Sequence, residues 1–245
     1  MLNNEEKNID FGNKKVKKTE KQTLVNNVFN SVADKYDLMN DLTSLGIHRL
    51  WKDSLINWLA PQPYQKLADI AGGTGDISMK FLLAGGYSAH IIDINKEMIT
   101  KGKLKNNNNN LSWTIASAEN LPMADNSYER ASMGFGLRNI TNRVLALKEV
   151  YRILKPGGRF ICLEFSHVEN SSLKKIYDIW SFEFMPRIGQ KITGDKEAYN
   201  YLVESIRQFP SQPELTQMFS EAGFDRVKYR NLSNGIVTLH SGWKL

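Results

Sequence analysis

The chain has 245 residues, of which 41% are hydrophobic and 24% charged, with a formal net charge of +6. This composition is typical of a globular protein, and the length suffices for one large α/β domain. The single cysteine, Cys162, excludes a disulfide within the chain and lies in an apolar run, so we expect a packed strand residue.

Residues 1–18 contain few apolar side chains, so we expect a poorly ordered leader. A group of lysines near its end supplies much of the positive charge, and such a run is usually a solvated tail. We therefore do not expect nucleic acid as a partner. There is neither an apolar run of about 18 residues nor the apolar core of a signal peptide, so we expect a cytoplasmic protein.

Two helices are expected next, and together residues 19–60 are interpreted as an N-terminal helical lid. From Leu24 apolar residues recur at helical spacing, and a second helix is expected to end at Pro61. Asp41 or Ser44 is the expected cap of this second helix. The side chains expected on its inner face are Ile47, Leu50, Trp51, Leu55 and Trp58.

The stretch KLADIAGGTGDISMKF, from Lys66 to Phe81, predicts a buried strand, a glycine turn and a helix. Such a turn suits a nucleotide-like ligand, because the backbone can approach it closely and the helix N-terminus offers free N–H groups. Asp76 would repel a pyrophosphate and Ser78 replaces the third glycine of a dinucleotide fingerprint. S-adenosylmethionine, which carries no phosphate, fits this turn better. The cofactor contacts expected at the turn are Asp69, Gly73 and Gly75.

Three more strands are expected to bring residues to the same crevice, since ligands of doubly wound sheets lie beyond the carboxyl ends of the strands. Asp93 ends the next strand and is placed to bind both ribose hydroxyls. Ser117, Ala118 and Glu119 follow the strand after it, and are expected near the adenine. A fourth strand leads to Gly134, Arg138 and Asn139.

The alternation of strands and helices up to Ser166 predicts a doubly wound, mostly parallel sheet with helices on both faces. Residues 171–210 interrupt the alternation and are interpreted as a helical insertion on the substrate side, either core-facing or a lid that touches a membrane. The last two alternating segments flank Ser233-Asn234-Gly235, which predicts an antiparallel hairpin at the sheet edge. A seven-stranded sheet with this edge is similar to a Rossmann-like class I methyltransferase, so residues 19–245 are expected to form one domain of that kind.

Four stretches together resemble the ubiquinone/menaquinone biosynthesis C-methyltransferases, the UbiE family. They are YDLMNDLTSLGIHRLWK, LADIAGGTGD, FGLRN and RILKPGGRFICLEFS, and NLSNGIVTLHSGWK near the end continues the similarity. The resemblance implies methyl transfer from S-adenosylmethionine to a ring carbon of a polyprenylated quinol: the benzoquinol of ubiquinone synthesis, demethylmenaquinol, or both. It also assigns Thr74, Asp93 and the pair Ser117–Ala118 to the cofactor. Ser117 stands where the family usually has Asn, and Gly134 stands where bacterial members often have Ser.

The catalytic candidates are Arg138 and Asn139, with Tyr36 and Asp37 closing over the pocket from the lid. A hydroquinone carbon becomes nucleophilic when a ring hydroxyl loses its proton, so Arg138 is expected to stabilise the phenolate or to orient a water, unless it forms a structural salt bridge. Asp37 is a candidate base. The secondary candidates are His48, His167, Tyr201 and His240.

No metal is expected, because no His and Cys cluster has ligand spacing. A hydrophobic, polyprenylated acceptor suggests peripheral contact with the inner face of the membrane. The chain is also expected to associate with a second copy of itself or with a quinone-biosynthesis assembly. The alternatives are another small-molecule methyltransferase with the same cofactor, a cofactor-binding scaffold of such an assembly and, more distantly, a dehydrogenase.

Overall fold

The computed structural model describes residues 8–32, 38, 40–41, 44–168, 187, 190 and 196–245. The predicted lid residues Tyr36 and Asp37, and most of the predicted insertion over 171–210, lie outside the described residues. In chain order the elements are β1 (Asn8–Phe11), β2 (Lys14–Lys17), α1 (Lys18–Val32), α3 (His48–Leu59), β3 (Lys66–Ile70), α4 (Asp76–Leu83), β4 (Ser88–Asp93), α5 (Lys96–Lys105), β5 (Leu111–Ile115), β6 (Tyr128–Gly134), η2 (Leu137–Asn139), α6 (Arg143–Ile153), β7 (Leu154–Phe165), α9 (Lys196–Arg207), α10 (Gln212–Glu221), β8 (Asp225–Leu232), η4 (Ser233–Gly235) and β9 (Val237–Lys244).

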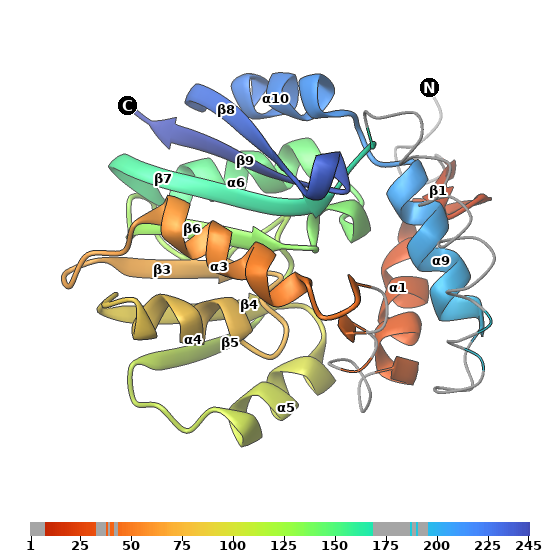
Figure 1. Cartoon of the computed structure of the whole chain (residues 1–245), viewed down its shortest axis with the longest axis horizontal. Helices are drawn as coiled ribbons and strands as arrows, with labels where there is room; N and C mark the ends of the chain where they lie inside the picture. Colours follow the sequence, from red (N-terminus) through yellow and green to blue (C-terminus); the bar gives the residue numbers. More distant parts are fainter. Residues whose placement is uncertain are drawn as a thin grey trace.

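A seven-stranded sheet forms the centre of the molecule, in the order β5-β4-β3-β6-β7-β9-β8 (Figure 1). Strands β3 to β7 are parallel, while β9 runs antiparallel to both β7 and β8. The predicted doubly wound sheet with an antiparallel C-terminal hairpin is therefore confirmed.

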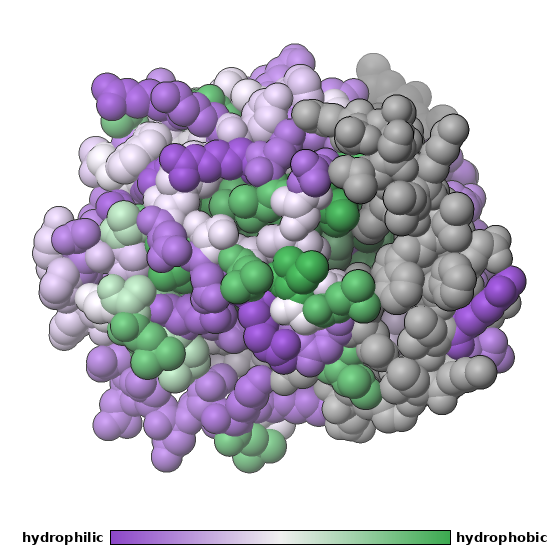
Figure 2. All heavy atoms as spheres, viewed as in Figure 1, coloured by the Kyte–Doolittle hydropathy of each residue, from purple (hydrophilic) through white to green (hydrophobic). Residues whose placement is uncertain are grey.

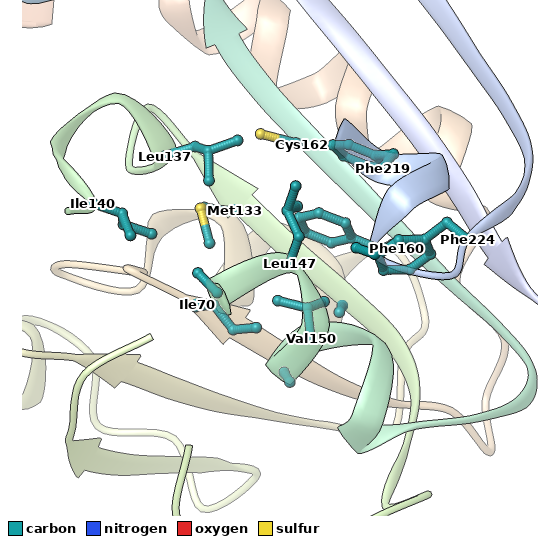
Figure 3. Close-up of a cluster of buried hydrophobic side chains, with 14 of the residues drawn as sticks. Ile70, Met133, Leu137, Ile140, Leu147, Val150, Phe160, Cys162, Phe219 and Phe224 are labelled. Carbon is teal, nitrogen blue, oxygen red and sulfur yellow. The ribbon is translucent and has the colours of Figure 1, made fainter. Parts of the chain in front are cut away.

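Both faces of the sheet are buried, because the inner strands are apolar on both sides. Along β7 the side chains of Phe160 and Cys162 face α6 and α10, while those of Ile161 and Leu163 face α3 and α4. Figure 3 shows the first of these two clusters, in which Phe219 of α10 packs on the sheet. Cys162 is a buried strand residue as predicted, and burial raises the pKa of its thiol.

Residues 8–17 form a β-hairpin, so the prediction of a poorly ordered leader is wrong for them. The ring of Phe11 stacks on that of Tyr201 in α9 with centroids 4.4 Å apart. Glu204 of the same helix accepts a hydrogen bond of 2.8 Å from the backbone N–H of Asn13 in the turn. A short polar hairpin is marginal alone, and its order depends on this distant helix, which local composition cannot indicate.

Helix α3 buries a different face from the one predicted. Trp51 and Leu55 are buried as expected, but Leu50 is 64% exposed and Ile47 39% exposed. The buried positions are His48, Trp51, Lys52, Leu55, Ile56 and Leu59, which recur three and four residues apart. Leu50 falls on the opposite face of this helix.

Arg130, an unusual residue for an inner strand, joins β6 to the end of α3. Its Nε donates to the carbonyl of Leu59 at 3.2 Å, and its guanidinium lies 5.7 Å from the ring centroid of Trp243. The carbonyls of a last helical turn lack intrahelical partners, so this arginine satisfies one of them. Burial lowers the pKa of Arg130.

Candidate functional site

A pocket lies at the carboxyl ends of the parallel strands, beneath α1. Figure 1 shows α1, α9 and the β1–β2 hairpin grouped beyond this edge of the sheet. The pocket is open to solvent on one side, and the empty space within it, including this opening, is about 720 Å³. It is lined by Gln22, Val25, Asn26, Ala71, Gly73, Asp93, Ile94, Asn95, Met98, Ala116, Ser117, Ala118, Glu119, Gly134, Phe135, Gly136, Asn139 and Ile140.

The predicted strand, glycine turn and helix are present, and the turn forms one wall of the pocket. The backbone takes left-handed φ values of 52° at Ala71, 57° at Gly73 and 80° at Gly75. A Cβ at Gly72 would lie 2.9 Å from the main-chain oxygen of Asp69, so no side chain fits there. The turn therefore presents bare backbone toward a ligand.

Asp93 is held at the pocket wall by two backbone donors. Its Oδ2 accepts the N–H of Gly73 at 2.9 Å, and its Oδ1 accepts the N–H of Asn95 at 2.8 Å. Burial raises the pKa of Asp93, although these backbone hydrogen bonds oppose the shift. Each carboxylate oxygen keeps a further lone pair, so the side chain can accept two ribose hydroxyls from a fixed position.

Ser117, Ala118 and Glu119 line the pocket, as predicted from their place after β5. The Oγ of Ser117 accepts the N–H of Glu119 at 3.1 Å, and Oε1 of Glu119 accepts the N–H of Asn142 at 2.9 Å. These hydrogen bonds join the loop after β5 to the start of α6. The wall near them is apolar, which suits the flat face of an adenine.

Asp69 does not line the pocket, although the sequence places it among the cofactor contacts. It is fully buried and accepts hydrogen bonds from the hydroxyls of Ser78, at 2.8 Å, and Ser132, at 2.7 Å. These residues belong to α4 and β6, so Asp69 joins both elements to β3. Burial raises its pKa to about 6, against the effect of the two hydroxyls.

Thr74 and Gly75 are likewise absent from the pocket lining. The carbonyl of Thr74 accepts a hydrogen bond of 2.8 Å from Nδ2 of Asn106. Gly75 packs where a Cβ would lie 2.8 Å from the ring of Trp113. Both residues shape the turn in this structure.

Asp76 faces Lys52 of α3 rather than the pocket. The two side chains form an ion pair of 2.6 Å. Burial opposes ionisation of Asp76, but the attraction of Lys52, Lys80 and Lys105 outweighs it and lowers the pKa. The expectation that Asp76 occupies the position of a pyrophosphate is therefore corrected, because its charge is used to attach α3 to α4.

Arg138 forms a buried ion pair with Glu164 of β7. Its guanidinium donates to Oε1 of Glu164 at 2.7 Å, and the backbone N–H of Arg138 donates to Oε2 at 3.2 Å. The side chains of Arg138 and Glu164 are 7% and 1% exposed. In the part of the chain that the structure describes, Nε of Arg138 is buried without a hydrogen-bond partner. The salt bridge expected as the alternative role is thus present, and Arg138 itself does not line the pocket.

Asn139, the neighbour of Arg138, lines the pocket itself. Its Oδ1 accepts a hydrogen bond of 3.0 Å from the hydroxyl of Tyr201 in α9. Burial raises the pKa of Tyr201 to about 12, so the phenol stays protonated and donates. This contact fixes the orientation of the Asn139 carboxamide at the pocket wall.

The three histidine candidates do not line the pocket. Nε2 of His48 lies 2.8 Å from Oδ1 of Asp41, and burial lowers the pKa of His48. His167 and His240 bond to main-chain carbonyls, and burial lowers the pKa of His240 to about 4. The N-cap of α3 is Ile47 rather than Asp41 or Ser44, although Oγ of Ser44 accepts the N–H of His48 at 3.2 Å.

Helix α1 supplies pocket residues that the sequence pattern does not identify, namely Gln22, Val25 and Asn26. Asn30 of the same helix accepts a hydrogen bond of 2.9 Å from Nδ2 of Asn95, which connects α1 to the end of β4. The amphipathic spacing of the α1 residues predicts a helix but does not show which part of the fold the helix covers. Ligands of doubly wound sheets lie beyond the carboxyl ends of the strands. Applying this to every residue shortly after a strand end would also have identified apolar pocket residues such as Met98.

The glycine at position 134 fits its surroundings closely. A Cβ there would lie 2.4 Å from Cδ1 of Ile77 in α4. Glycine at this position, where members of the family often have serine, therefore leaves space for the side chain of Ile77.

Within the described ranges, no three His, Cys, Asp or Glu side chains are grouped as metal ligands. Among the same residues, no helix is long and apolar enough to cross a membrane.

Known proteins match nearly the whole of this chain. The model of the ubiE/COQ5 methyltransferase family matches residues 14–244. The ubiquinone/menaquinone biosynthesis C-methyltransferase UbiE of Brucella anthropi is 54% identical over 243 residues, which cover 96% of this chain and 92% of that protein. The UbiE protein of Brucella abortus is 53% identical, with 96% and 90% covered.

Solved structures share the fold. A SAM-dependent methyltransferase from Thermotoga maritima gives a TM-score of 0.66 at 21% identity, covering 89% of this chain and 99% of that one. Another from Aquifex aeolicus gives 0.58 at 15% identity, covering 84% and 98%. Because the family model matches nearly the whole chain and relatives are more than half identical to it, the chain belongs to the ubiE/COQ5 methyltransferase family.

Proposed function

We propose that this enzyme transfers a methyl group from S-adenosylmethionine to a ring carbon of a polyprenylated quinol in ubiquinone or menaquinone biosynthesis. The observation that carries the proposal is the pocket across the strand ends, with Asp93 held by two backbone N–H groups at its wall. The type of reaction is inferred from membership of the family, and the class of acceptor is inferred from the names of the relatives.

The pocket residues fit the cofactor by their chemistry. Asp93 is placed to accept the two ribose hydroxyls, and the loop of Ser117, Ala118 and Glu119 borders the space for adenine. Bare backbone at Gly73 leaves room for the methionyl part. When bound, S-adenosylmethionine supplies a strongly electrophilic methyl group, so the protein must orient an acceptor carbon and exclude water.

The acceptor end is proposed at Asn139 and Arg138. The carboxamide of Asn139 reaches the pocket, and the adjacent guanidinium carries an Nε donor without a partner in the described part of the chain. A donor fixed in a water-poor site stabilises developing phenolate charge strongly. Tyr36 and Asp37 remain proposed as lid residues over this end.

Peripheral membrane contact is proposed for the residues that precede and begin α3. Leu45 is 70% exposed, Leu50 64% and Ile47 39%, and Figure 2 shows hydrophobic side chains gathered over this end of the helix. On the other side of α3, Trp51 packs against Phe135 of the pocket with ring centroids 6.2 Å apart. An apolar surface next to the site suits an acceptor whose tail lies in a bilayer.

A transfer assay tests the function. Purified protein is incubated with methyl-labelled S-adenosylmethionine and a reduced short-chain benzoquinol or naphthoquinol, and the product is analysed by mass spectrometry. We expect label on a ring carbon, and loss of S-adenosylhomocysteine binding in the Asp93→Ala variant by calorimetry. Label on oxygen or nitrogen would indicate a different methyltransferase, and cofactor binding without any transfer would indicate a scaffold.

A further inference from the structure

A groove lies between the β1–β2 hairpin, α1 and α9, three elements that Figure 1 shows grouped beyond the strand ends. It is distinct from the pocket described above. The empty space within it, including its open side, is about 1100 Å³. The apolar side chains that line this groove are Phe11, Val16, Leu24, Val28, Ala198 and Tyr201.

The polar residues of the groove lie mainly at its rim. Lys14, Asn27 and Glu197 are exposed, whereas all six apolar lining residues are buried or half-buried. Asn200 and Glu204 are half-buried, and Glu204 accepts a hydrogen bond of 2.8 Å from a backbone N–H of the hairpin turn. The groove therefore has an apolar floor and a polar rim, an arrangement typical of sites that take up the apolar part of a small ligand.

Helix α1 forms a wall of both the groove and the pocket. Val25 and Asn26 line the pocket, and Leu24 and Val28 line the groove. With 3.6 residues per turn, these two pairs fall on opposite faces of the helix. The two spaces are therefore neighbours, on either side of one helix.

Tyr201 of α9 is a second connection between the two spaces. Its ring lines the groove and stacks on the ring of Phe11, with centroids 4.4 Å apart. Its hydroxyl points the other way and donates a hydrogen bond of 3.0 Å to Oδ1 of Asn139, which lines the pocket. At this point a single side chain, held by one neutral hydrogen bond, separates the groove from the proposed acceptor end.

The proposed acceptor has one large apolar part, its polyprenyl tail. Asp93 and Ser117 assign the cofactor to the side of the pocket near the glycine turn, so an acceptor ring at Asn139 has its tail directed away from that side. A tail that leaves past Tyr201 enters the groove directly. Burial of its carbons against the apolar floor is favourable in proportion to the apolar area removed from water.

We propose that the groove between the hairpin, α1 and α9 binds the first isoprene units of the acceptor tail. This inference rests on the proposed function. The tail passes beside the ring of Tyr201 when the hydrogen bond to Asn139 opens. The carboxamide oxygen of Asn139 is then free to accept a hydrogen bond from a ring hydroxyl of the acceptor.

The first experiment compares a quinol without a tail and a quinol with four isoprene units, both in the same detergent micelles. Leu24→Glu is the variant, because Leu24 is half-buried in the groove and does not line the pocket. A carboxylate there loses hydration when a tail covers it, so kcat/KM for the tailed quinol should fall about 10-fold or more, through KM. Activity on the quinol without a tail should stay within about twofold of the wild type, since the pocket is unchanged.

The matched control is Leu104→Glu, which makes the same change at a leucine that is 82% exposed on α5. It should retain the wild-type preference for the tailed quinol. A tailed quinone with a diazirine on its second isoprene unit provides a second, direct measurement. After irradiation, we expect label in peptides from residues 11–28 or 196–207, and less label in Leu24→Glu.

The inference is overturned if Leu24→Glu keeps the wild-type preference for the tailed quinol or loses activity equally on both quinols. Label confined to other segments, such as the start of α3, would also overturn it. Failure of the proposed function is distinct, because the wild type would then form no C-methylated product from either quinol, whereas the labelling does not require turnover.

Discussion

Two buried charged groups with different environments show how single residues support the site. The carboxyl group of Asp69 has only hydroxyl partners among the described side chains, and burial raises its pKa to about 6. The opposite charges of Arg138 and Glu164 instead compensate each other in a buried ion pair. The first group is a structural link behind the glycine turn, whereas the second lies one residue from a pocket side chain.

Asp69 should make stability depend on pH. Because its folded pKa of about 6 exceeds the ordinary value of 3.8, the folded state binds the proton more tightly, and the wild type loses stability as pH rises through this window. The loss is roughly 3 kcal/mol. Asp69→Asn keeps the hydroxyl contacts without this titration, so its stability relative to the wild type should increase by that amount between about pH 4 and pH 7. Urea unfolding measures both proteins, and a difference that stays constant with pH would contradict the raised pKa.

Arg138 needs a variant that separates folding from catalysis. Arg138→Ala leaves Glu164 buried and unpaired, which costs about 3–5 kcal/mol, so a loss of activity alone decides nothing. The double variant Arg138→Met/Glu164→Gln removes both charges and keeps an amide oxygen for a backbone N–H that Glu164 accepts, so it should fold nearly as well as the wild type. We expect it to bind S-adenosylhomocysteine normally and to lose about 100-fold in turnover. Turnover within a few-fold of the wild type would leave Arg138 with a structural role only.

Among the elements, α3 combines two roles on opposite faces. Its buried face carries Trp51 against Phe135 and Phe165, and Lys52 against Asp76 of α4. The opposite face is exposed and apolar at its beginning. The helix therefore connects a candidate membrane surface with a wall of the pocket.

Glutamate at Leu45 and Leu50 should weaken vesicle binding. Removing two leucines from an apolar contact costs about 1.5–3 kcal/mol each, so flotation with anionic vesicles should fall about 100-fold or more. The matched control is Leu83→Glu/Leu104→Glu, because these leucines are 81% and 82% exposed on α4 and α5. Activity on a short-chain quinol should stay unchanged in both variants. Equal flotation of the Leu45/Leu50 variant and the wild type would exclude this surface.

Across the whole molecule, the strand order assembles the pocket. The order β5-β4-β3-β6 places the ends of four strands side by side, so Asp93, Ser117 and Gly134 lie around the glycine turn although they are distant in the chain. Helix α1 covers this edge, and the hairpin at residues 8–17 contacts α9 through Phe11 and Tyr201. Residues near the N-terminus thereby become part of the same region as Asn139.

Local signals in the sequence are enough to predict the sheet, the glycine turn and part of the pocket wall. Apolar runs and glycines mark the strands and the turn, and parallel strands direct their carboxyl ends to one edge, so Gly73, Asp93 and Ser117 can be assigned from the sequence. The inner face of α3 is predicted only in part, because an apolar residue such as Leu50 shows its exposure only once the helix is docked.

The pairing of side chains across the fold follows from the tertiary structure and from no local pattern. The fold buries Asp69 behind the turn, pairs Asp76 with Lys52 and orders the β1–β2 hairpin against α9. The physical reason is that burial and pairing depend on residues far apart in the chain, and an ionisable side chain acquires its pKa from those neighbours rather than from its place in the sequence.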